Sequence, residues 1–141
     1  DWLLKQGVTH IIGSHPHVIQ PMELRTDSIT RTQHAVVYSL GNFISNMSKV
    51  NTDGGLIFTL ELEKDTTTST SPQVRVQRCG YNFVWTARPN FTKEKNYVLY
   101  PTDSTSISKL PEAAHNHLNI FVKNSRKLLQ QHNVGIKENK K

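Results

Sequence analysis

The residues in this chain whose types and spacing could do chemistry are two histidines in the stretch GSHPHVIQP, residues 13–21. His15 and His17 are separated only by Pro16, whose fixed φ stiffens the backbone between them. Neutral imidazole is the commonest metal ligand among side chains, so the pair predicts a metal-binding loop. The alternative is a polar loop in which both rings bond to nearby backbone. The His-X-His motif alone does not decide between the two.

Two imidazoles do not complete a catalytic metal centre. Such a centre takes three protein ligands, or more when two metals are bridged. The other candidate ligands are scattered along the chain, with Asp27, Asp53 and Asp103 in polar segments and His10 and His34 in or beside apolar ones. We therefore expect His15 and His17 to form one side of a larger site.

No catalytic nucleophile is predicted. Ser14 precedes His15 directly, but adjacent backbone positions rarely give the hydrogen bond that activates a serine, and no orienting aspartate is evident. Cys79 is the single cysteine and has no histidine at motif spacing, so we expect a small, half-buried strand residue. His115 and His117 are two residues apart on an expected helix, so they point to different faces and are expected at the surface.

The elements expected to position the histidine loop are strands. Residues 8–12 form a short apolar run after Gly7 and predict a buried, parallel strand that ends at Gly13. Ligand-binding loops of α/β proteins lie at this carboxyl end. Residues 20–25 and 35–39 are expected to be strands, with a turn at residues 27–32 and a polar loop at residues 45–55.

The rest of the chain predicts a long hairpin and a helix. Residues 56–62 and 74–85 alternate as strands and are expected to pair antiparallel across a flexible Thr/Ser-rich loop at residues 65–72. From Ser108, a capping residue, and Pro111 an apolar stripe predicts a helix. The fold class is α/β in the broad α+β sense, divided into a β-rich portion (1–107), a C-terminal helix (108–135) and a basic tail (136–141).

Composition excludes several classes of protein. Apolar residues make up 35% of the 141 and charged residues 20%, so the chain is globular, and no apolar run reaches the roughly 20 residues of a membrane span. The net charge is +6, of which +5 lies in residues 123–141. We interpret this charge as a solvated helix face with a frayed tail, and expect no nucleic-acid partner. The opening DWLLKQG indicates the C-terminal piece of a longer protein.

Longer motifs carry a resemblance to a known family. The run GVTHIIGSHPHVIQPME, followed by AVVYSLGNFI and GGLIFTLEL, resembles the C-terminal half of the CapA family, the poly-γ-glutamate capsule synthesis proteins. The resemblance covers residues 1 to about 64 and places the chain near the calcineurin-like metallophosphoesterases. It implies the C-terminal half of a β-sandwich with mixed strands, flanked by helices. It also implies that His15 and His17 match a late Gly-His-X-His loop of a two-metal centre, with Ser14 where the family often has histidine.

The same resemblance implies partners and cofactors. The Asp-X-His, Gly-Asp and Gly-Asn-His-like motifs of the other half are absent here, so the full-length protein would hold Mn, Fe or Zn and the fragment alone need not hold any metal. The expected partner is the missing N-terminal half, or a second copy through an open sheet edge. The parent protein would be located in the cell envelope or outside the cytoplasm, and would be a metal-dependent hydrolase that the fragment alone does not reconstitute.

Two further residues are candidates for a supporting or substrate-binding role. Glu23 could orient a ligating imidazole, as carboxylates often do, or be an exposed strand residue. Asn42 of SLGNF could approach the histidines from a neighbouring strand end, or hold a turn. The alternative to an enzyme is a non-catalytic β-rich module that binds or assembles a cell-envelope polymer.

Overall fold

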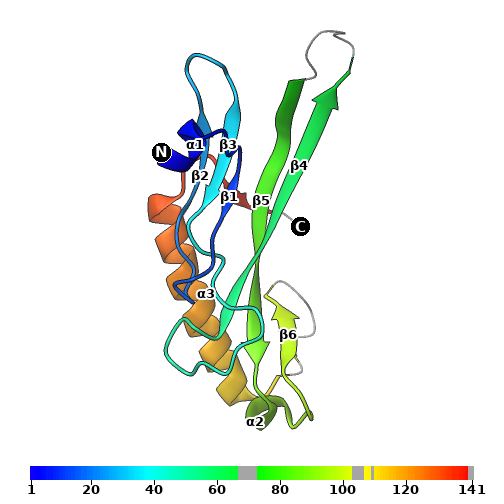
Figure 1. Ribbon diagram of the computed structural model, residues 1–141. Helices are drawn as coiled ribbons and strands as arrows, with labels where there is room; N and C mark the ends of the chain where they lie inside the picture. The colour runs from blue at the N-terminus through cyan, green and yellow to red at the C-terminus, as the bar shows by residue number, and fades with distance from the viewer. Residues whose placement is uncertain (67–72, 103–106, 109, 140–141) are drawn as a thin grey trace.

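A computed structural model describes residues 1–66, 73–102, 107, 108 and 110–139 and shows an α+β fold, which confirms the expected class (Figure 1). Mixed sheets and one long helix account for most of it. In chain order the elements are α1 (Trp2–Lys5), β1 (Ile11–Ile12), β2 (Met22–Thr26), β3 (Gln33–Val37), β4 (Gly54–Asp65), β5 (Gln73–Ala87), α2 (Pro89–Thr92), β6 (Val98–Pro101), α3 (Glu112–His132) and β7 (Lys137–Glu138).

The first sheet has the order β1-β3-β2 and carries the histidine loop at the end of β1. β1 runs parallel to β3, as predicted, and β2 runs antiparallel to β3. The expectation of a buried strand was wrong, because β1 is an edge strand of only two residues and Ile12 is 49% exposed. The opposite edge of the sheet is covered, because the backbone of Val134 bonds to that of Met22 and Leu24.

The second sheet is built on the predicted hairpin. β4 and β5 pair antiparallel from Gly54–Trp85 outward, with a register shift between Glu61 and Leu62. The expected loop at residues 65–72 lies, for residues 67–72, outside the described part of the chain. β6 and β7 pair with the other edge of β5, β6 antiparallel and β7 parallel.

The C-terminal segment is not a frayed tail over the residues that the structure describes. Lys137 and Glu138 form β7, and Ile136 just before them is buried. Glu138 also forms a bidentate ion pair with Arg126 of α3, at 2.7 and 2.9 Å. The sequence showed only the charge of this segment and not its pairing with β5, so the expectation was wrong for residues 136–139.

One core joins the helix to both sheets. α3 begins at Glu112 after Pro111, slightly later than predicted, and ends at His132 before Gly135 as expected. It lies along both sheets (Figure 1) and buries an apolar stripe against them. The largest core side chains are Met22 and Val37 from the first sheet, Phe83 and Trp85 from the second, and Phe121 and Leu129 from α3. Burial of a large apolar side chain stabilises a fold by about 1.5–3 kcal/mol.

The two sheets also meet through backbone at the segment after β3. Leu56 of β4 donates its N–H to the carbonyl of Leu40 at 2.9 Å, and Gly41 and Gly55 form an antiparallel bridge. This junction lies directly beside Asn42. The position of Asn42 is therefore fixed by both sheets.

Candidate functional site

The histidine loop is anchored at its first residue. Gly13 donates its N–H to the carbonyl of Val37 at 2.8 Å and accepts from Leu40 N–H at 2.9 Å. A Cβ on Gly13 would lie 2.5 Å from the carbonyl oxygen of Tyr38, so only glycine permits this approach. The turn is closed by His17 N–H, which bonds to Ser14 O at 3.3 Å. The loop is therefore held at its start and within the turn.

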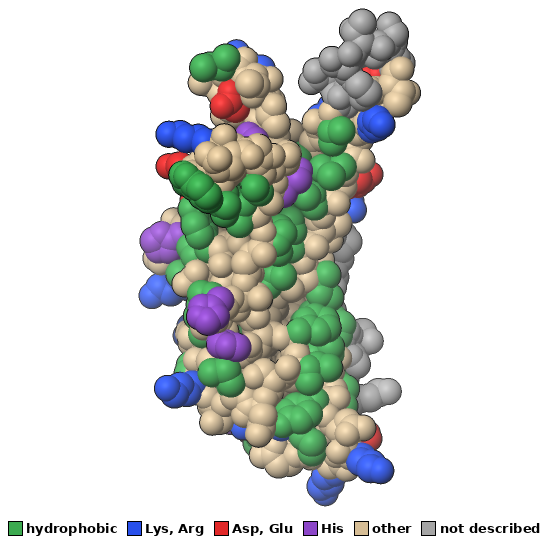
Figure 2. All heavy atoms as spheres, in the orientation of Figure 1, with side chains coloured by type: hydrophobic (Ala, Val, Ile, Leu, Met, Phe, Trp, Pro, Cys, Tyr) green, Lys and Arg blue, Asp and Glu red, His purple; other side chains and the backbone are tan. Residues whose placement is uncertain are grey.

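His15 and His17 lie side by side at the surface. Their ring centroids are 6.3 Å apart and the ring planes are inclined by 46°. His17 has a left-handed backbone with φ 59°, a conformation that costs a non-glycine residue about 1–3 kcal/mol. Histidine side chains are visible on the face of the molecule in Figure 2. The same left-handed backbone conformation occurs at Arg31 and Lys93, which are also exposed, so the strain alone does not mark His17 as functional.

Asn42 contacts His17 directly. The His17 Nδ1 atom lies 2.8 Å from Asn42 Oδ1. Asn42 is only 7% exposed, and its Nδ2 donates to Thr52 O at 2.8 Å. Gly41 before it has φ 77°, which is typical of a turn. Both expectations for Asn42 thus describe the same geometry, since the turn is what brings the side chain to the histidine.

A hollow of about 360 Å³ opens beside His17. Its lining combines apolar side chains with polar groups of the histidine loop and of Asn42. Phe43 lines it and is half exposed, so one apolar ring is available to a bound molecule. The lining residues are Ser14, His17, Leu40, Gly41, Asn42, Phe43 and Leu56.

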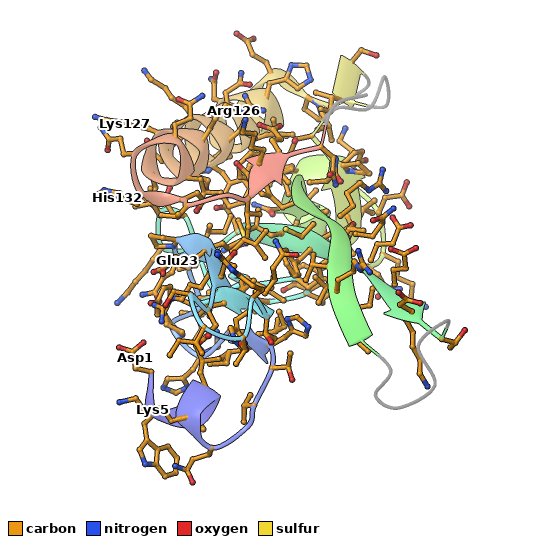
Figure 3. The ribbon with its side chains drawn as sticks, turned by 90° about the horizontal axis from the view of Figure 1, so that it is seen from above. Asp1, Lys5, Glu23, Arg126, Lys127 and His132 are labelled. Atoms are coloured by element: carbon orange, nitrogen blue, oxygen red, sulfur yellow. The ribbon has the colours of Figure 1, made fainter. Side chains whose placement is uncertain are left out.

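Glu23 lies in a different cluster. Its carboxylate accepts from Arg25 Nε at 2.6 Å and from the Tyr38 hydroxyl at 3.0 Å, and Arg25 also bonds to Asp1 at 2.7 Å. Figure 3 shows Asp1 and Glu23 labelled in the view from above. The hydrogen bond from Arg25 holds the pKa of Glu23 below its usual value. Among the described contacts of this carboxylate, none is with His15 or His17, so the structure does not bring these residues together.

The aspartates in polar segments have local partners where the structure describes them. Asp27 accepts the N–H groups of Ile29 and Thr30 in its own turn, and the bond from Thr30 lowers the pKa of its carboxyl most. Asp53 accepts from Trp85 Nε1 at 2.9 Å. Asp103 lies outside the described residues. Over the part of the chain that is described, no three His, Cys, Asp or Glu side chains lie close enough to hold a metal ion.

A second pair of histidines, which the sequence did not single out as a pair, joins β1 to β3. His10 Nδ1 accepts the N–H of buried Ala35 at 3.1 Å, and His34 Nδ1 lies 2.9 Å from Thr9 O. Burial, with a smaller contribution from His34, lowers the pKa of His10. A prediction that the apolar segments around residues 8–12 and 35–39 are neighbouring strands would have brought His10 and His34 together.

Cys79 and His117 have the exposure that the sequence predicted, whereas His115 does not. Cys79 is half-buried on β5, and burial raises the pKa of its thiol. His117 is exposed, although its ring contacts Phe91 with centroids 4.9 Å apart. His115 differs from the prediction, because it is half-buried and its Nε2 contacts Ile107 O.

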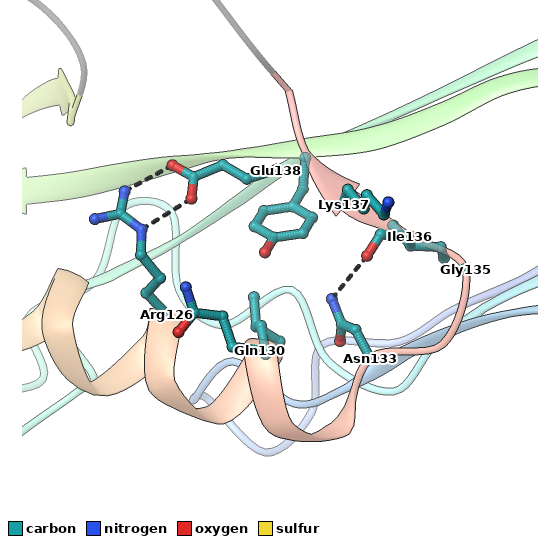
Figure 4. A pocket seen from close by; sticks show the side chains of 9 residues that line it. Arg126, Gln130, Asn133, Gly135, Ile136, Lys137 and Glu138 are labelled. Atoms are coloured by element: carbon teal, nitrogen blue, oxygen red, sulfur yellow. Dashed lines mark hydrogen bonds and ion pairs between the residues drawn. The ribbon is translucent and has the colours of Figure 1, made fainter.

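Another hollow, of about 300 Å³, lies between α3 and β7 (Figure 4). The Arg126–Glu138 ion pair closes one side of it, and Asn133 Nδ2 donates to Ile136 O on another. The cation and the carboxylate there neutralise each other. Its polar groups therefore serve the docking of β7 onto β5.

The fold and the loop define an α+β domain with a histidine pair at the carboxyl end of a parallel strand. Residues 1–47 match the family model described as bacterial capsule synthesis protein PGA_cap, which confirms the resemblance over the first third of the chain. His15, His17 and Asn42 all lie within this match. No curated protein and no solved structure matches the chain.

The family match also bears on location. A capsule is a layer of the bacterial cell envelope, so the match associates the chain with cell-envelope biosynthesis. Among the described helices, none has the length and apolar character needed to cross a bilayer.

Proposed function

We propose that this chain is the C-terminal portion of a capsule synthesis protein with a metal-dependent phosphoesterase-type fold, and that His15 and His17 are ligands of its metal centre. The observation that carries the proposal is the pair of exposed imidazoles, with centroids 6.3 Å apart, held by an anchored loop. The match of residues 1–47 to a capsule synthesis family supports it.

The two rings lie slightly further apart than one divalent ion requires. With metal–nitrogen distances of about 2.0–2.1 Å, two imidazoles on one tetrahedral ion have centroids about 5 Å apart. The observed separation is 6.3 Å, so the exposed side chain of His15 would move toward His17 for the two rings to share an ion. Two neighbouring ions, each bound by one histidine, fit the same spacing. Either arrangement needs further ligands, which we assign to the rest of the protein.

The chemistry that such ions supply is activation of a water and neutralisation of charge on a phosphate ester. In the complete protein, at the cell envelope, the histidine loop would hold the metal and the hollow beside His17 would accept the group next to the scissile bond. The 141-residue chain alone would lack phosphoesterase activity, because two ligands fall short of a catalytic centre.

The exposed edge of β1 is where we expect the rest of the protein to bind. Ile12 is half exposed there, and Trp2, Leu3 and Val8 near it are also exposed. An open edge offers unpaired backbone groups to another strand. In the absence of the N-terminal half we expect the chain to self-associate, which light scattering at increasing concentration tests. A monomer at every concentration would contradict this expectation.

The metal site is tested by calorimetric titration of this chain with Mn²⁺ and Zn²⁺. We expect binding that is weakened by His15→Ala or by His17→Ala and lost in the double variant. His132→Ala is the matched control, since it removes an exposed histidine at the end of α3. Binding that survives the double substitution would contradict the assignment of the metal site to His15 and His17.

A further inference from the structure

We propose that Asn42 is a positioning residue that fixes His17 in the tautomer with the proton on Nδ1, so that Nε2 presents its lone pair to a metal. The tautomer follows from hydrogen bonds in this chain, whereas its consequence for a metal rests on the function proposed above. The segment 43–53 folds back to hold Asn42 in this role.

The orientation of the Asn42 amide is set by what surrounds it. Thr52 O, 2.8 Å from Asn42 Nδ2, is a backbone carbonyl and can only accept a hydrogen bond. The sulfur of Met47, 3.6 Å from the same nitrogen, is a weak acceptor. Both contacts require the NH₂ group on that side. The amide oxygen of Asn42 therefore faces His17.

That orientation decides where the imidazole proton is. An amide oxygen only accepts, so His17 Nδ1, at 2.8 Å from it, must be the donor. A neutral imidazole carries one proton, and Nε2 is then the unprotonated nitrogen. No hydrogen bond to Nε2 of His17 is found among the described residues. In water the other tautomer of histidine is preferred, so the bond to Asn42 reverses the usual preference.

Asn42 is itself held by the backbone of β4 and of the loop before it. Its N–H donates to Gly54 O at 3.0 Å, and its carbonyl oxygen lies so close to Gly55 that a Cβ there would clash with it. Thr52 is buried and its hydroxyl donates to Lys49 O at 2.7 Å, which closes the loop that presents Thr52 O. The side chain that orients His17 is thus more tightly fixed than His17, which is exposed.

Because the His17 ring is already fixed, metal binding loses less conformational entropy in ordering it. A ligating imidazole whose second nitrogen is bonded keeps its tautomer and orientation, and loss of such a partner lowers metal affinity by roughly 10–100-fold. His17 makes this contact with its backbone in the left-handed conformation. We infer that the SLGNF turn exists beside the loop for this contact.

Asn42→Asp and Asn42→Leu form a matched pair that tests the inference. Both lose the NH₂ group and therefore its bond to Thr52 O, and the aspartate also places a second oxygen near that carbonyl, so it should be at least as destabilised as the leucine variant. Only the aspartate keeps an acceptor for His17 Nδ1. The His17 tautomer is measured from imidazole ¹⁵N shifts in the metal-free chain at about pH 8, above the usual imidazole pKa of about 6.5.

The expected result is an Nδ1–H tautomer in the wild-type chain and in Asn42→Asp, and a shift toward Nε2–H in Asn42→Leu. A predominantly Nε2–H tautomer in the wild type, or one that is unchanged in Asn42→Leu, would overturn the inference. This readout needs no metal, so it fails or succeeds independently of the proposed function.

The second measurement is metal affinity of the same variants. Asn42→Leu should weaken Zn²⁺ binding by roughly 10–100-fold, while Asn42→Asp should bind at least as tightly as the wild type. Asn42→Asp combined with His17→Ala should show no gain over His17→Ala alone. A gain would mean that the new carboxylate ligates the ion itself, which would overturn the positioning role. Unchanged affinity in Asn42→Leu would overturn it as well, whereas a wild-type chain that binds no metal would contradict only the proposed function.

Discussion

Two histidine pairs lie near β1, and they use their ring nitrogens differently. In the first pair, His10, before β1, accepts the backbone N–H of Ala35, and His34, on β3, bonds to Thr9 O. In the second pair, after β1, His15 and His17 are exposed and one ring nitrogen is bonded to a side chain. The first pair extends the contacts between β1 and β3, and the second pair presents nitrogens to solvent. Burial and bonding partner, rather than residue type or spacing, separate structural histidines from candidate ligands.

The largest effect is expected from Gly13→Ala, which breaks the carboxyl end of the strand. The added Cβ would meet Tyr38 O at 2.5 Å, so β1 must move off β3. We expect a loss of about 3 kcal/mol in the free energy of unfolding by urea denaturation, together with weaker metal binding.

Gly7→Ala is the control in the segment between α1 and β1. Gly7 has φ 88°, but a Cβ added there would meet no atom within 4 Å, so the substitution adds only backbone strain of about 1 kcal/mol. Metal affinity should not change. Equal effects of the two substitutions on metal affinity would contradict the assignment of the site to the end of β1.

The next largest effect is expected from His10→Leu. It leaves the N–H of Ala35, which is fully buried, without its acceptor, and an unsatisfied buried donor costs about 1–2 kcal/mol. His10→Asn should retain most of the stability, because its amide oxygen can occupy the place of Nδ1. Chemical denaturation of both variants measures the difference. His17→Ala, at the other end, should change stability far less, and a larger loss there than in His10→Leu would reverse the comparison.

The pH dependence of stability should also come from the first pair, chiefly from His10. The pKa of His10 is lowered in the folded chain, so the unfolded chain takes up a proton more readily. The contribution of His10 to stability is therefore complete above about pH 6.5 and is lost as the pH falls through the lower, folded-state value. His34 is the neighbouring charged group that adds to this shift.

Denaturation at about pH 7.5 and 5.5 should show this loss in the wild type and a smaller one in His10→Asn. The lowered pKa values of Glu23 and Asp27 act only at more acidic pH, below the usual carboxyl range, so they do not confound the measurement. An identical pH dependence in His10→Asn would remove His10 as its source.

The smallest effect is expected at His34. His34→Leu removes the bond to Thr9 O, which lies at the surface and contributes about 0.5–1 kcal/mol. His34→Asn keeps a donor in the position of Nδ1 and should be nearly neutral. Thermal unfolding of the pair tests this. A His34→Leu effect as large as that of His10→Leu would show that burial does not set the difference between the two bonds.

Periodicity predicted the elements more reliably than their surroundings. The alternation of residues 56–62 and 74–85 led to the hairpin because it is a local property, and the apolar stripe led to α3 for the same reason. The exposure of β1 could not be read from its apolar run, since the position of a strand within a sheet depends on distant segments. The same holds for β7, whose two residues pair with the distant β5.

In the candidate site, too, the local features could be predicted from the sequence and the long-range contacts could not. His15 and His17 could be found because their spacing is local. The contact between His17 and Asn42 joins residues 25 apart in sequence and depends on a turn, a loop and two sheets, so the sequence left the role of Asn42 open. Glu23 was a wrong candidate for a partner of the histidines, because its carboxylate accepts a hydrogen bond from Arg25, only two residues away. The distance in sequence between Glu23 and the histidines gave no information about that bond.

The close approach of the two sheets at Gly55 has a consequence for how this chain can vary. A Cβ on Gly55 would clash with the carbonyl oxygens of Asn42 and Leu40, and both of these atoms belong to the main chain. On β5, a Cβ on Gly80 would instead clash first with the side-chain oxygen of Asn139. A smaller residue at position 139 can make room for alanine at position 80, so these two positions should covary among relatives. Position 55 has no such compensating partner, so we expect relatives of this chain to keep glycine there.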